Sequence, residues 1–535
     1  MVVDVGTGLS GRSDVMKVRI ACRVSTGLAA VLLTGALAAS TQLLHAQGPD
    51  TPIAIVGATV IDGNGGPPLR DATILVKGRQ IAAVGARSSV TVPAGARVID
   101  GTGKFVMPGI IDTNVHVGPL GGQTSFARYW DRLEDIILQA SQLHLKYGVT
   151  TVRDSYGPLT ALKHVRDAIA RGDEVGPRMY VAGNIVGWGG PFSDTFSRTR
   201  ESGLDLFQEE MNELFTMGSG EELIHMSADE LRVAINKYLD QGPDFIKYGG
   251  TSHGNYPTMI GFSSRAQKVI VEETQKRGLI AETHSTTLEG LWMSIMAGLD
   301  MIQHPEVVGN REITDELVNL IVQRKIICSM LPNKYTGKVW QDHVKEREKK
   351  AADKNESEDK PAKPQRQSPK TPAEIRRALE ETGVKQDGTL LIPNLEMRRA
   401  NFVKLLRGGA LMTVGADNVV GEAPEFRRTK KDEHLEPGIG TIIAIEGMVE
   451  LGMTPAQAIV AATKNGARAC KALDKFGTLE PGKIADVLVL AADPLASIAN
   501  IRKLEVVLKG GRIIDLKSLP TKRPYGPWSS TSDPN

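Results

Sequence analysis

Cysteine is scarce in this sequence. Among 535 residues only Cys22, Cys328 and Cys470 occur, which is too few for a disulfide framework. The chain also has no CxxC motif and no cluster of cysteine with histidine. These absences exclude a fold that depends on disulfide bonds.

An excess of charge of one sign is also lacking. Lysine and arginine number 64 against 62 aspartate and glutamate, for a net charge of +2. Basic residues are scattered along the chain, so we expect no nucleic acid partner. Hydrophobic residues make up 41% and charged residues 24%, the composition of a globular protein. A chain of this length can hold a large core and a second unit.

The apolar run near the N-terminus is too short for a membrane span. It reads GLAAVLLTGALAAS and follows the basic segment 16–23. A basic segment, an apolar run of about 15 residues and an alanine-rich exit are typical of a secretory signal peptide. We therefore predict a signal peptide and leader over 1–48, cleaved near Ala38 or Ala46, and a mature protein that is periplasmic or secreted, with no membrane span. The alternative is an uncleaved anchor.

Both ends of the remaining chain carry short strand patterns. Residues 49–108 and 476–520 are rich in β-branched residues and are bounded by Gly, Asn or Pro. The simplest account is one small β-sandwich domain built from both chain ends, followed by a tail over 521–535.

Strand and helix patterns alternate between these two parts, over 109–475. GVTTVRD (148–154) and FIKYGG (245–250), for example, each precede a helical pattern. About eight such units predict an α/β fold with a closed (β/α)₈ TIM barrel. An open doubly wound sheet is the competing architecture, but no GxGxxG follows a strand and opens a helix.

One segment breaks this alternation. Residues 345–372 are charged, contain proline and have almost no large apolar side chains. Such a segment buries too little surface to offset its ordering entropy, so we predict a flexible insertion after the seventh strand of the barrel. It is either a solvated linker or a lid over the mouth of the barrel.

Polar side chains end or follow several of the buried strand patterns. They are His116, Lys247, His284, His304 and Asp417. In a parallel barrel these strand ends converge on one face, and imidazole and carboxylate groups gathered there suit Zn²⁺ or a similar divalent ion. Taken singly, each has another explanation: a hydrogen-bonded loop histidine, a lysine that reaches solvent, or an aspartate that caps a helix.

An ordered set of motifs carries a family resemblance. The motifs are PGIIDTNVH, GVTTVRD, FIKYGG, ETHSTTLEGLWMSIMAGLDMIQHPE, VGADN, LGMTPAQAIVAATKNGARA and GTLEPGKIADVLVL. Together the sequence resembles the metal-dependent amidohydrolase superfamily, in particular its imidazolonepropionase-like and Xaa-Pro dipeptidase-like members. The resemblance covers about 53–515 and implies a (β/α)₈ barrel with a split β-sandwich.

The resemblance also implies roles for the polar residues. His284 and His304 match ligands of one metal ion, and Lys247 matches a lysine that CO₂ carboxylates so that it bridges two ions. Asp417 matches the aspartate that binds metal or water and transfers a proton. His116 matches the second histidine of the family's HxH pair.

The first histidine of that pair is Asn114 in this sequence. Two positions apart on a strand, Asn114 and His116 point the same way, but an amide oxygen is a weaker ligand than imidazole for Zn²⁺. Three outcomes stay open: two metal ions with Asn114 as a poor ligand, one ion at His284, His304 and Lys247, or a protein without catalysis.

The ligand set implies hydrolysis of a C–N bond. A metal-activated water attacks a carbonyl, and Asp417 takes the proton and returns it to the leaving nitrogen. His253 and Tyr248 are candidates to bind substrate or stabilise the oxyanion. Substrates implied are small amides, short peptides and N-acyl amino acids, with Arg198 and Arg200 as candidate carboxylate ligands.

The same residues are also compatible with other classes of protein. A non-catalytic scaffold, a deaminase or a lactone hydrolase would keep the fold, which alone does not choose among them. A homo-oligomer is compatible with every one of these readings.

Overall fold

The structure is a computed structural model that describes residues 51–196, 203–253, 259–309, 311–358, 394–427 and 430–526. The chain divides into two compact units, 1–47 and 48–535, and every described residue belongs to the second. The predicted signal peptide and leader, 1–48, lie outside the described residues.

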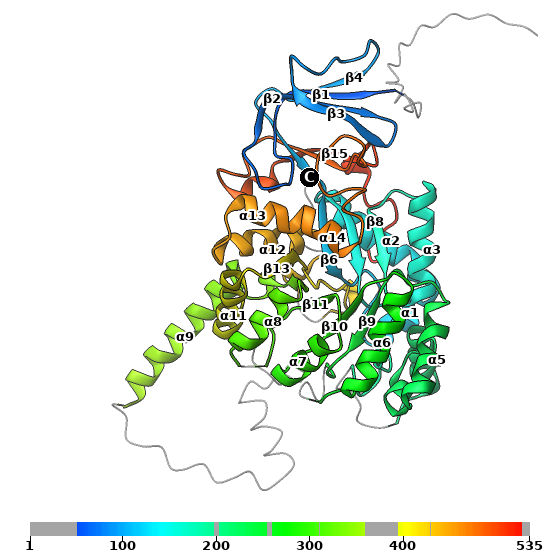
Figure 1. The fold of residues 1–535 in the computed structure, drawn as a ribbon. Helices are drawn as coiled ribbons and strands as arrows, with labels where there is room; N and C mark the ends of the chain where they lie inside the picture. Colours follow the sequence, from blue (N-terminus) through cyan, green and yellow to red (C-terminus); the bar gives the residue numbers. More distant parts are fainter. Residues whose placement is uncertain are drawn as a thin grey trace, which may run out of the picture. The chain divides into compact units, whose positions relative to one another are not determined.

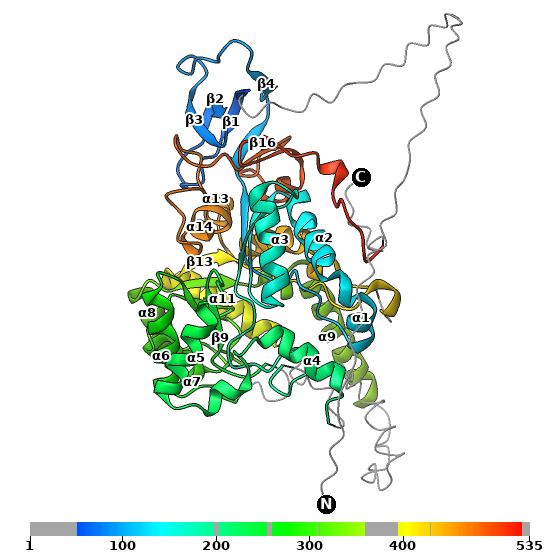
Figure 2. The same ribbon diagram turned by 90° about the vertical axis from the view of Figure 1, so that its right-hand side faces the viewer.

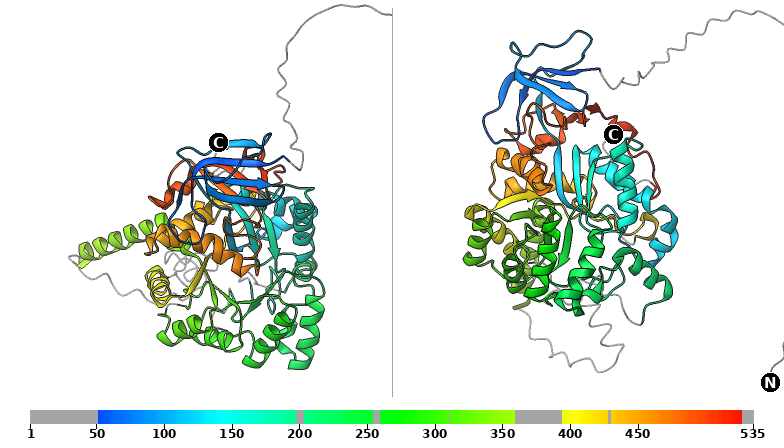
Figure 3. Two further views of the ribbon diagram at one scale, coloured as in Figure 1. Left: turned by 45° about the horizontal axis from the view of Figure 1, so that its top comes forward. Right: turned by 45° about the vertical axis from the view of Figure 1, so that its right-hand side comes forward.

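Strands from both ends of the chain share one sheet (Figure 3). Its order is β16-β15-β14-β5-β1-β2-β3, and β4 pairs with β1. The junction of the two ends is the antiparallel pairing of β14 with β5, where Leu488 faces Met107. The packing of two sheets into a β-sandwich stays a prediction. The strands are β1 (Ile53–Val60), β2 (Leu69–Lys77), β3 (Gln80–Ala86), β4 (Arg97–Asp100), β5 (Phe105–Pro108), β14 (Val487–Leu490), β15 (Leu504–Lys509) and β16 (Arg512–Ile513).

Eight further strands form two parallel sheets. Nearly every residue in them is buried, as expected for parallel strands covered by helices. The three-stranded sheet has the order β6-β7-β8, and the five-stranded sheet has the order β13-β12-β11-β10-β9. The strands are β6 (Ile110–Val115), β7 (Val149–Asp154), β8 (Arg178–Val181), β9 (Ile246–Gly249), β10 (Ala281–His284), β11 (Met301–Gln303), β12 (Ile327–Met330) and β13 (Leu411–Val414).

Backbone hydrogen bonds connect these two sheets at both of their edges. Val186, which follows β8, donates to the carbonyl of Lys247 at 2.8 Å and accepts from Gly249 at 2.9 Å. At the other edge, His116 donates to the carbonyl of Asn418 at 3.0 Å. The α/β class is therefore confirmed, whereas closure of the eight strands into a barrel stays a prediction at this point.

Helices follow most of these strands and pack against them (Figures 1 and 2). The main helices are α1 (Gln123–Tyr129), α2 (Leu133–Lys146), α3 (Leu159–Arg171), α4 (Leu206–Thr216), α5 (Ala228–Leu239), α6 (Ser264–Lys276), α7 (Leu288–Met296), α8 (Asp315–Gln323), α9 (Gly337–Glu358), α11 (Leu395–Gly408), α12 (Ile439–Glu450), α13 (Pro455–Val460) and α14 (Gly466–Ala469). Short helical turns are η1 (Trp130–Arg132), η2 (Glu221–His225), η3 (Pro332–Lys334), η4 (Pro424–Phe426), η5 (Glu433–Leu435), η6 (Ala461–Asn465), η7 (Ile498–Arg502) and η8 (Leu516–Ser518).

Local sequence explains where several helices begin. Ser227 and Glu230 form a capping box at the start of α5, and the side chain of Asn394 accepts from the backbone of Met397 at the start of α11. Such caps satisfy backbone N–H groups that have no partner within the helix. None of the described helices is both long enough and apolar enough to span a membrane.

The first part of the predicted flexible insertion, 345–372, is helical. Helix α9 continues to Glu358, and the remainder of the segment lies outside the described residues. Lysine and glutamate are good helix formers, and pairs four residues apart, such as Glu346 with Lys350 at 2.7 Å, support an exposed helix. A lack of apolar residues therefore does not by itself predict an irregular segment.

A buried ion pair connects the two parallel sheets. Arg153 of β7 lies 2.5 Å from Glu282 of β10, and both side chains are at most 1% exposed. Gln303 of β11 donates to the same carboxylate at 2.7 Å, and the guanidinium lies over the ring of Phe245. A buried charge is tolerated only when it is paired and hydrogen-bonded, and this one is.

We predict that Glu282→Gln destabilises the fold, because it leaves the charge of Arg153 buried without a counter-ion. The expected loss in the free energy of unfolding is about 3–5 kcal/mol. Arg171→Gln is the control, since its ion pair with Asp173 is exposed and should contribute less than about 1 kcal/mol. Denaturant unfolding followed by circular dichroism measures both, and equal effects would contradict the prediction.

Candidate active site

The residues singled out in the sequence lie at or just after the carboxyl ends of parallel strands. Asn114 lies in β6, His116 follows it, Lys247 lies in β9, His284 ends β10, His304 follows β11, and Asp417 follows β13. His253 lies in the loop after β9. Because the carboxyl ends of parallel strands meet at the same edge, the topology gathers these side chains.

Two side-chain pairs bring four of these residues into contact. His116 Nε2 lies 2.9 Å from Asp417 Oδ1, and His284 Nδ1 lies 3.0 Å from His304 Nε2. The ring centroids of His253 and His284 are 5.4 Å apart, so the loop histidine joins this group. Residues far apart in the sequence thus share one polar cluster, in which the three other histidines are buried and His253 is exposed.

Two members of the cluster have a left-handed backbone. The φ angles are 42° at His304 and 48° at Asp417, a region that residues with a β-carbon rarely adopt. Backbone hydrogen bonds of 2.7 Å hold both, from His304 to the carbonyl of Ser329 and from Asp417 to the carbonyl of Asn114. Strained residues held in this way occur preferentially at functional sites.

Burial keeps the histidines of the cluster neutral. It lowers the pKa of His304 to about 3 and that of His284 well below its usual range. The pKa of His116 is also lowered, because burial outweighs the attraction of Asp417. A neutral imidazole has a free nitrogen lone pair, the form that binds metal ions or accepts protons.

Asp417, in contrast, is held as a carboxylate. Burial by itself would raise its pKa, but Lys334, His116 and His304 together hold it well below the ordinary value. The ammonium of Lys334 donates to the Asp417 carbonyl at 2.8 Å and lies 3.7 Å from its Oδ2. The sequence analysis did not single out Lys334. Its only signal in the sequence is that a polar residue follows β12, the seventh of the eight parallel strands.

Lys247 lies almost fully buried among acidic groups, with 2% of its surface exposed. Burial lowers its pKa, while Asp417, Glu282 and Asp154 oppose that shift. A lysine must lose its proton before it can react with CO₂, and desolvation favours the neutral amine. Its surroundings are therefore compatible with a carboxylated lysine.

Asn114 is fully buried, and neither polar atom of its side chain has a hydrogen-bond partner among the residues that the structure describes. Leaving a buried amide unpaired costs free energy, and such an amide can be a ligand. Among the described residues, no three His, Cys, Asp or Glu side chains form a metal-binding group. The two pairs, His116 with Asp417 and His284 with His304, would need Asn114 or a modified Lys247 to complete a ligand set.

An aromatic wall, made of Tyr156, Trp188 and Phe196, lies beside the histidines. Phe196 stacks on His253 with ring centroids 5.5 Å apart and on Tyr156 at 4.7 Å. Trp188 contacts His284 edge-on at 4.9 Å. These rings give one side of the cluster an apolar surface, which suits an apolar or aromatic part of a ligand.

The prediction that Tyr248 binds substrate is wrong. Side chains alternate along β9, so Tyr248 points to the opposite face from Lys247. Its hydroxyl donates to Gln267 of α6 at 3.2 Å, and the side chain is fully buried. Arg198 and Arg200 lie outside the described residues.

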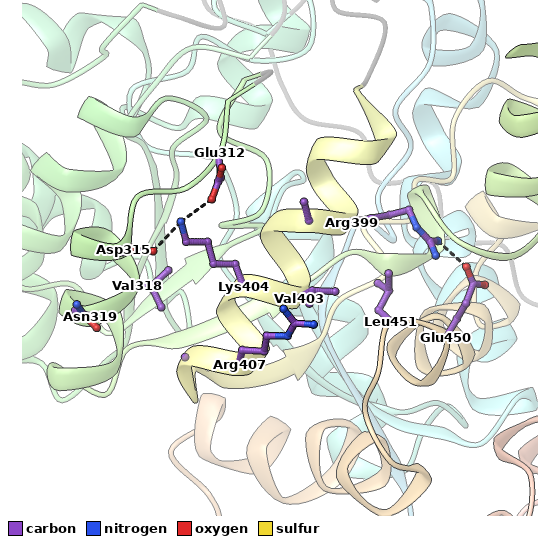
Figure 4. A pocket seen from close by; sticks show the side chains of 12 residues that line it. Glu312, Asp315, Val318, Asn319, Arg399, Val403, Lys404, Arg407, Glu450 and Leu451 are labelled. Carbon is purple, nitrogen blue, oxygen red and sulfur yellow. Dashed lines mark hydrogen bonds and ion pairs between the residues drawn. The ribbon is translucent and has the colours of Figure 1, made fainter.

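A separate hollow lies on the outside of the molecule, between α8 and α11 (Figure 4). Most of its charged side chains are already paired, Lys404 with Glu312 and Asp315, and Arg399 with Glu450. None of the polar residues that end the parallel strands lines it. We therefore place the candidate site at the histidine cluster and not in this hollow.

Residues 105–514 match the amidohydrolase family. The chain belongs to the amidohydrolase family. It is thus an enzyme of a hydrolase family whose members generally bind divalent metal ions. The earlier resemblance is confirmed, since matches also include imidazolonepropionase of Haloarcula marismortui and a solved Xaa-Pro dipeptidase.

Similar proteins span nearly the whole chain. The solved structure of molinate hydrolase is 29% identical with a TM-score of 0.75, and covers 91% of this chain and 99% of its own. Phenylurea hydrolase B is 30% identical with a TM-score of 0.72, at 88% and 98% coverage. Ochratoxinase of Aspergillus niger is 23% identical over 91% of this chain and 90% of its own. The family and these structures imply a TIM-barrel fold.

We predict that His304 makes the stability of the metal-free protein depend on pH. Its pKa in the folded state is about 3, so below about pH 6.5 the unfolded chain binds a proton there that the folded chain does not. Stability from this residue is complete above pH 6.5 and falls by about 1.4 kcal/mol per pH unit as the pH decreases toward 3.

Unfolding of the wild type and His304→Gln, in buffer with a chelator, measures this effect. The difference in unfolding free energy between them should shrink from pH 7 to pH 5. His225→Gln, at an exposed histidine, is the control for removal of an imidazole. A difference that is constant over this range would contradict a neutral, buried His304.

Proposed function

We propose that this protein is an exported, metal-dependent hydrolase that cleaves the C–N bond of an amide by attack of water. The proposed substrates are small amides, including N-acyl amino acids and short peptides. The observation that carries the proposal is the meeting of His116 with Asp417 and of His284 with His304 beside buried Lys247. Similarity to enzymes named for hydrolysis of molinate, phenylureas and ochratoxin supports it.

The donor set fits a divalent ion. Two nitrogen ligands about 2.0–2.1 Å from a tetrahedral Zn²⁺ are roughly 3.4 Å apart, close to the 3.0 Å between His284 and His304. A carboxylated Lys247 would add an anionic ligand to this pair. His116, Asp417 and Asn114 would hold a second ion, more weakly because an amide replaces an imidazole.

Each residue of the site has a separate role in hydrolysis. When bound, a divalent ion supplies Lewis acidity, which polarises a carbonyl and makes water acidic enough to react at neutral pH. Asp417 is the general base that takes the proton of the attacking water and then donates it to the leaving nitrogen. Lys334 orients Asp417, and His253 donates to the developing oxyanion.

We extend the proposal to the architecture and location. The backbone hydrogen bonds at both edges of the parallel sheets support a closed (β/α)₈ barrel over 109–475. The shared sheet supports a β-domain built from 49–108 and 476–520. The basic and apolar N-terminal segment supports export, and a homo-oligomer stays compatible with this arrangement.

Asn114 supports an alternative, a non-catalytic or altered member of the family, such as a deaminase or a lactone hydrolase. The two amide atoms of Asn114, which have no partner in the described part of the chain, stand where the family's first metal-ligand histidine is expected. Product analysis separates these reactions, because deamination releases ammonia and amide cleavage releases an amine or an amino acid.

We predict that the purified enzyme contains a divalent metal and hydrolyses members of a panel of amides and dipeptides. Lys247→Ala and His304→Ala should lose both metal and turnover, with a decrease in kcat/KM above about 100-fold. Mutation of residues that only hydrogen-bond to metal ligands already lowers metal affinity or activity about 10–100-fold. Lys237→Ala, at an exposed lysine, is the control. Elemental mass spectrometry and liquid chromatography of products measure the two properties. A stable, metal-free wild type without turnover would instead favour the scaffold.

We predict that Asn114→His raises the metal content of the protein toward two ions per chain. Imidazole is the better ligand for Zn²⁺. Asn114→Ala is the matched variant, which should not raise the metal content. If both variants hold as much metal as the wild type, Asn114 is not at a ligand position.

A further inference from the structure

Another hollow, here called the junction hollow, lies where the sheet built from both chain ends meets α3 and β8. Its volume is about 230 Å³. The sheet contributes the turn between β2 and β3 and the turn between β15 and β16. Arg178, which also lines the hollow, is the first residue of β8. The hollow therefore lies at the amino ends of the parallel strands, whereas the histidine cluster lies at their carboxyl ends.

Positive charge dominates the lining of the junction hollow. Two turns of the shared sheet place cations beside each other there. Lys509 and Arg512 are directly opposite in the antiparallel pair of β15 with β16, so their side chains lie on the same face. Nη1 of Arg512 lies 3.8 Å from the point that a β-carbon on Gly172 would occupy, at the end of α3. The cationic residues of the lining are Arg79, Arg166, Arg171, Arg178, Lys509 and Arg512, and its acidic residue is Glu174.

The carboxylates around the junction hollow are already engaged with cations. Three of the lining arginines form ion pairs of 2.8 Å, Arg166 with Asp167 and Asp244, Arg171 with Asp173, and Arg178 with Asp486. Glu174 lies 3.5 Å from Lys522. These arginines need no further counter-ion, and the acidic groups have little charge left to offer to the other cations.

The remaining three cations, Arg79, Lys509 and Arg512, have no such partner. Their side chains form no hydrogen bond or ion pair with any residue that the structure describes. Lys509 is half-buried, and burial together with the charge of Arg178 lowers its pKa to about 8. Asp486 opposes this shift, but its carboxylate is bonded to Arg178 and to the backbone N–H of Gly510 at 2.8 Å. A partly desolvated ammonium among other cations is unfavourable, and a bound anion would remove that cost.

We propose that the junction hollow is a binding site for a small phosphate-type oxyanion. Lys509 supplies a point charge, and the guanidinium groups of Arg79 and Arg512 supply paired N–H donors that match the oxygens of such an anion. One water molecule takes about 30 Å³ in the liquid, so the hollow admits a tetrahedral anion together with several waters or a small organic substituent. A bound oxyanion would fasten the shared sheet to α3 and β8. This inference does not depend on the proposed hydrolase function.

Calorimetric titration with inorganic phosphate and with glycerol 3-phosphate tests the site, at an ionic strength held constant with chloride. We expect the wild type to bind at least one of them with a Kd below about 1 mM. Arg512→Gln and Lys509→Gln should each raise that Kd at least about tenfold, because each removes a charged hydrogen bond. Arg97→Gln, at an exposed arginine of β4 outside the hollow, is the matched control and should change the Kd less than about twofold. Binding of inorganic phosphate indicates a free anion as the ligand, and tighter binding of the ester indicates a phosphate monoester.

Denaturant unfolding gives a second measurement. Phosphate should raise the unfolding midpoint of the wild type above that in chloride, because a ligand that binds only the folded chain stabilises it. The same comparison should show no increase for Arg512→Gln. Arg512 is exposed, so this variant decides the inference even if Lys509→Gln does not fold.

The inference is overturned if neither ligand binds to the wild type, or if Arg97→Gln weakens binding as much as Arg512→Gln does. The second outcome would show that net charge alone attracts phosphate. Turnover of amides should be unchanged in Arg512→Gln, because the junction hollow and the histidine cluster lie at opposite ends of the parallel strands. Either outcome therefore leaves the proposed function intact.

Discussion

The contact between β6 and the segment after β13 is the constraint on which the rest of the site depends. Asp417 donates its backbone N–H to the carbonyl of Asn114 at 2.7 Å, and His116 donates to Asn418 at 3.0 Å. The carboxyl group of Asp112 reinforces this seam, because it accepts from the hydroxyl of Thr441 at 2.6 Å and from the backbone of Ala416 at 3.3 Å. Without the seam, His116 and Asp417 would not meet.

The chemistry of the cluster follows from its burial. Removing water makes protonated imidazole unfavourable, so the histidines stay neutral, while Lys334 keeps Asp417 ionised. One site thus holds free nitrogen lone pairs and a carboxylate base at the same pH. Its surroundings shift the pKa values of these groups, as is typical of functional sites. The cost is strain at His304 and Asp417, and unpaired polar atoms such as those of Asn114.

Several features could be predicted from the sequence because they depend on neighbours along the chain. The strands that carry Lys247 and His284, and the strand that precedes His304, are predicted by short buried patterns. The two-residue spacing at the end of β6 places Asn114 and His116 on one face. The helical part of 345–372 could not be predicted from its low apolar content. Local Glu–Lys pairs, such as Glu346 with Lys350, stabilise that helix without a buried face.

The sequence by itself determined the family, the α/β class and the residue types that end the strands, since these depend on patterns a few residues long. Only the tertiary structure decided that Lys334 holds Asp417 and that Tyr248 faces α6. These contacts join residues from separate loops and helices. Their geometry depends on how the strands and helices pack, which no local pattern specifies.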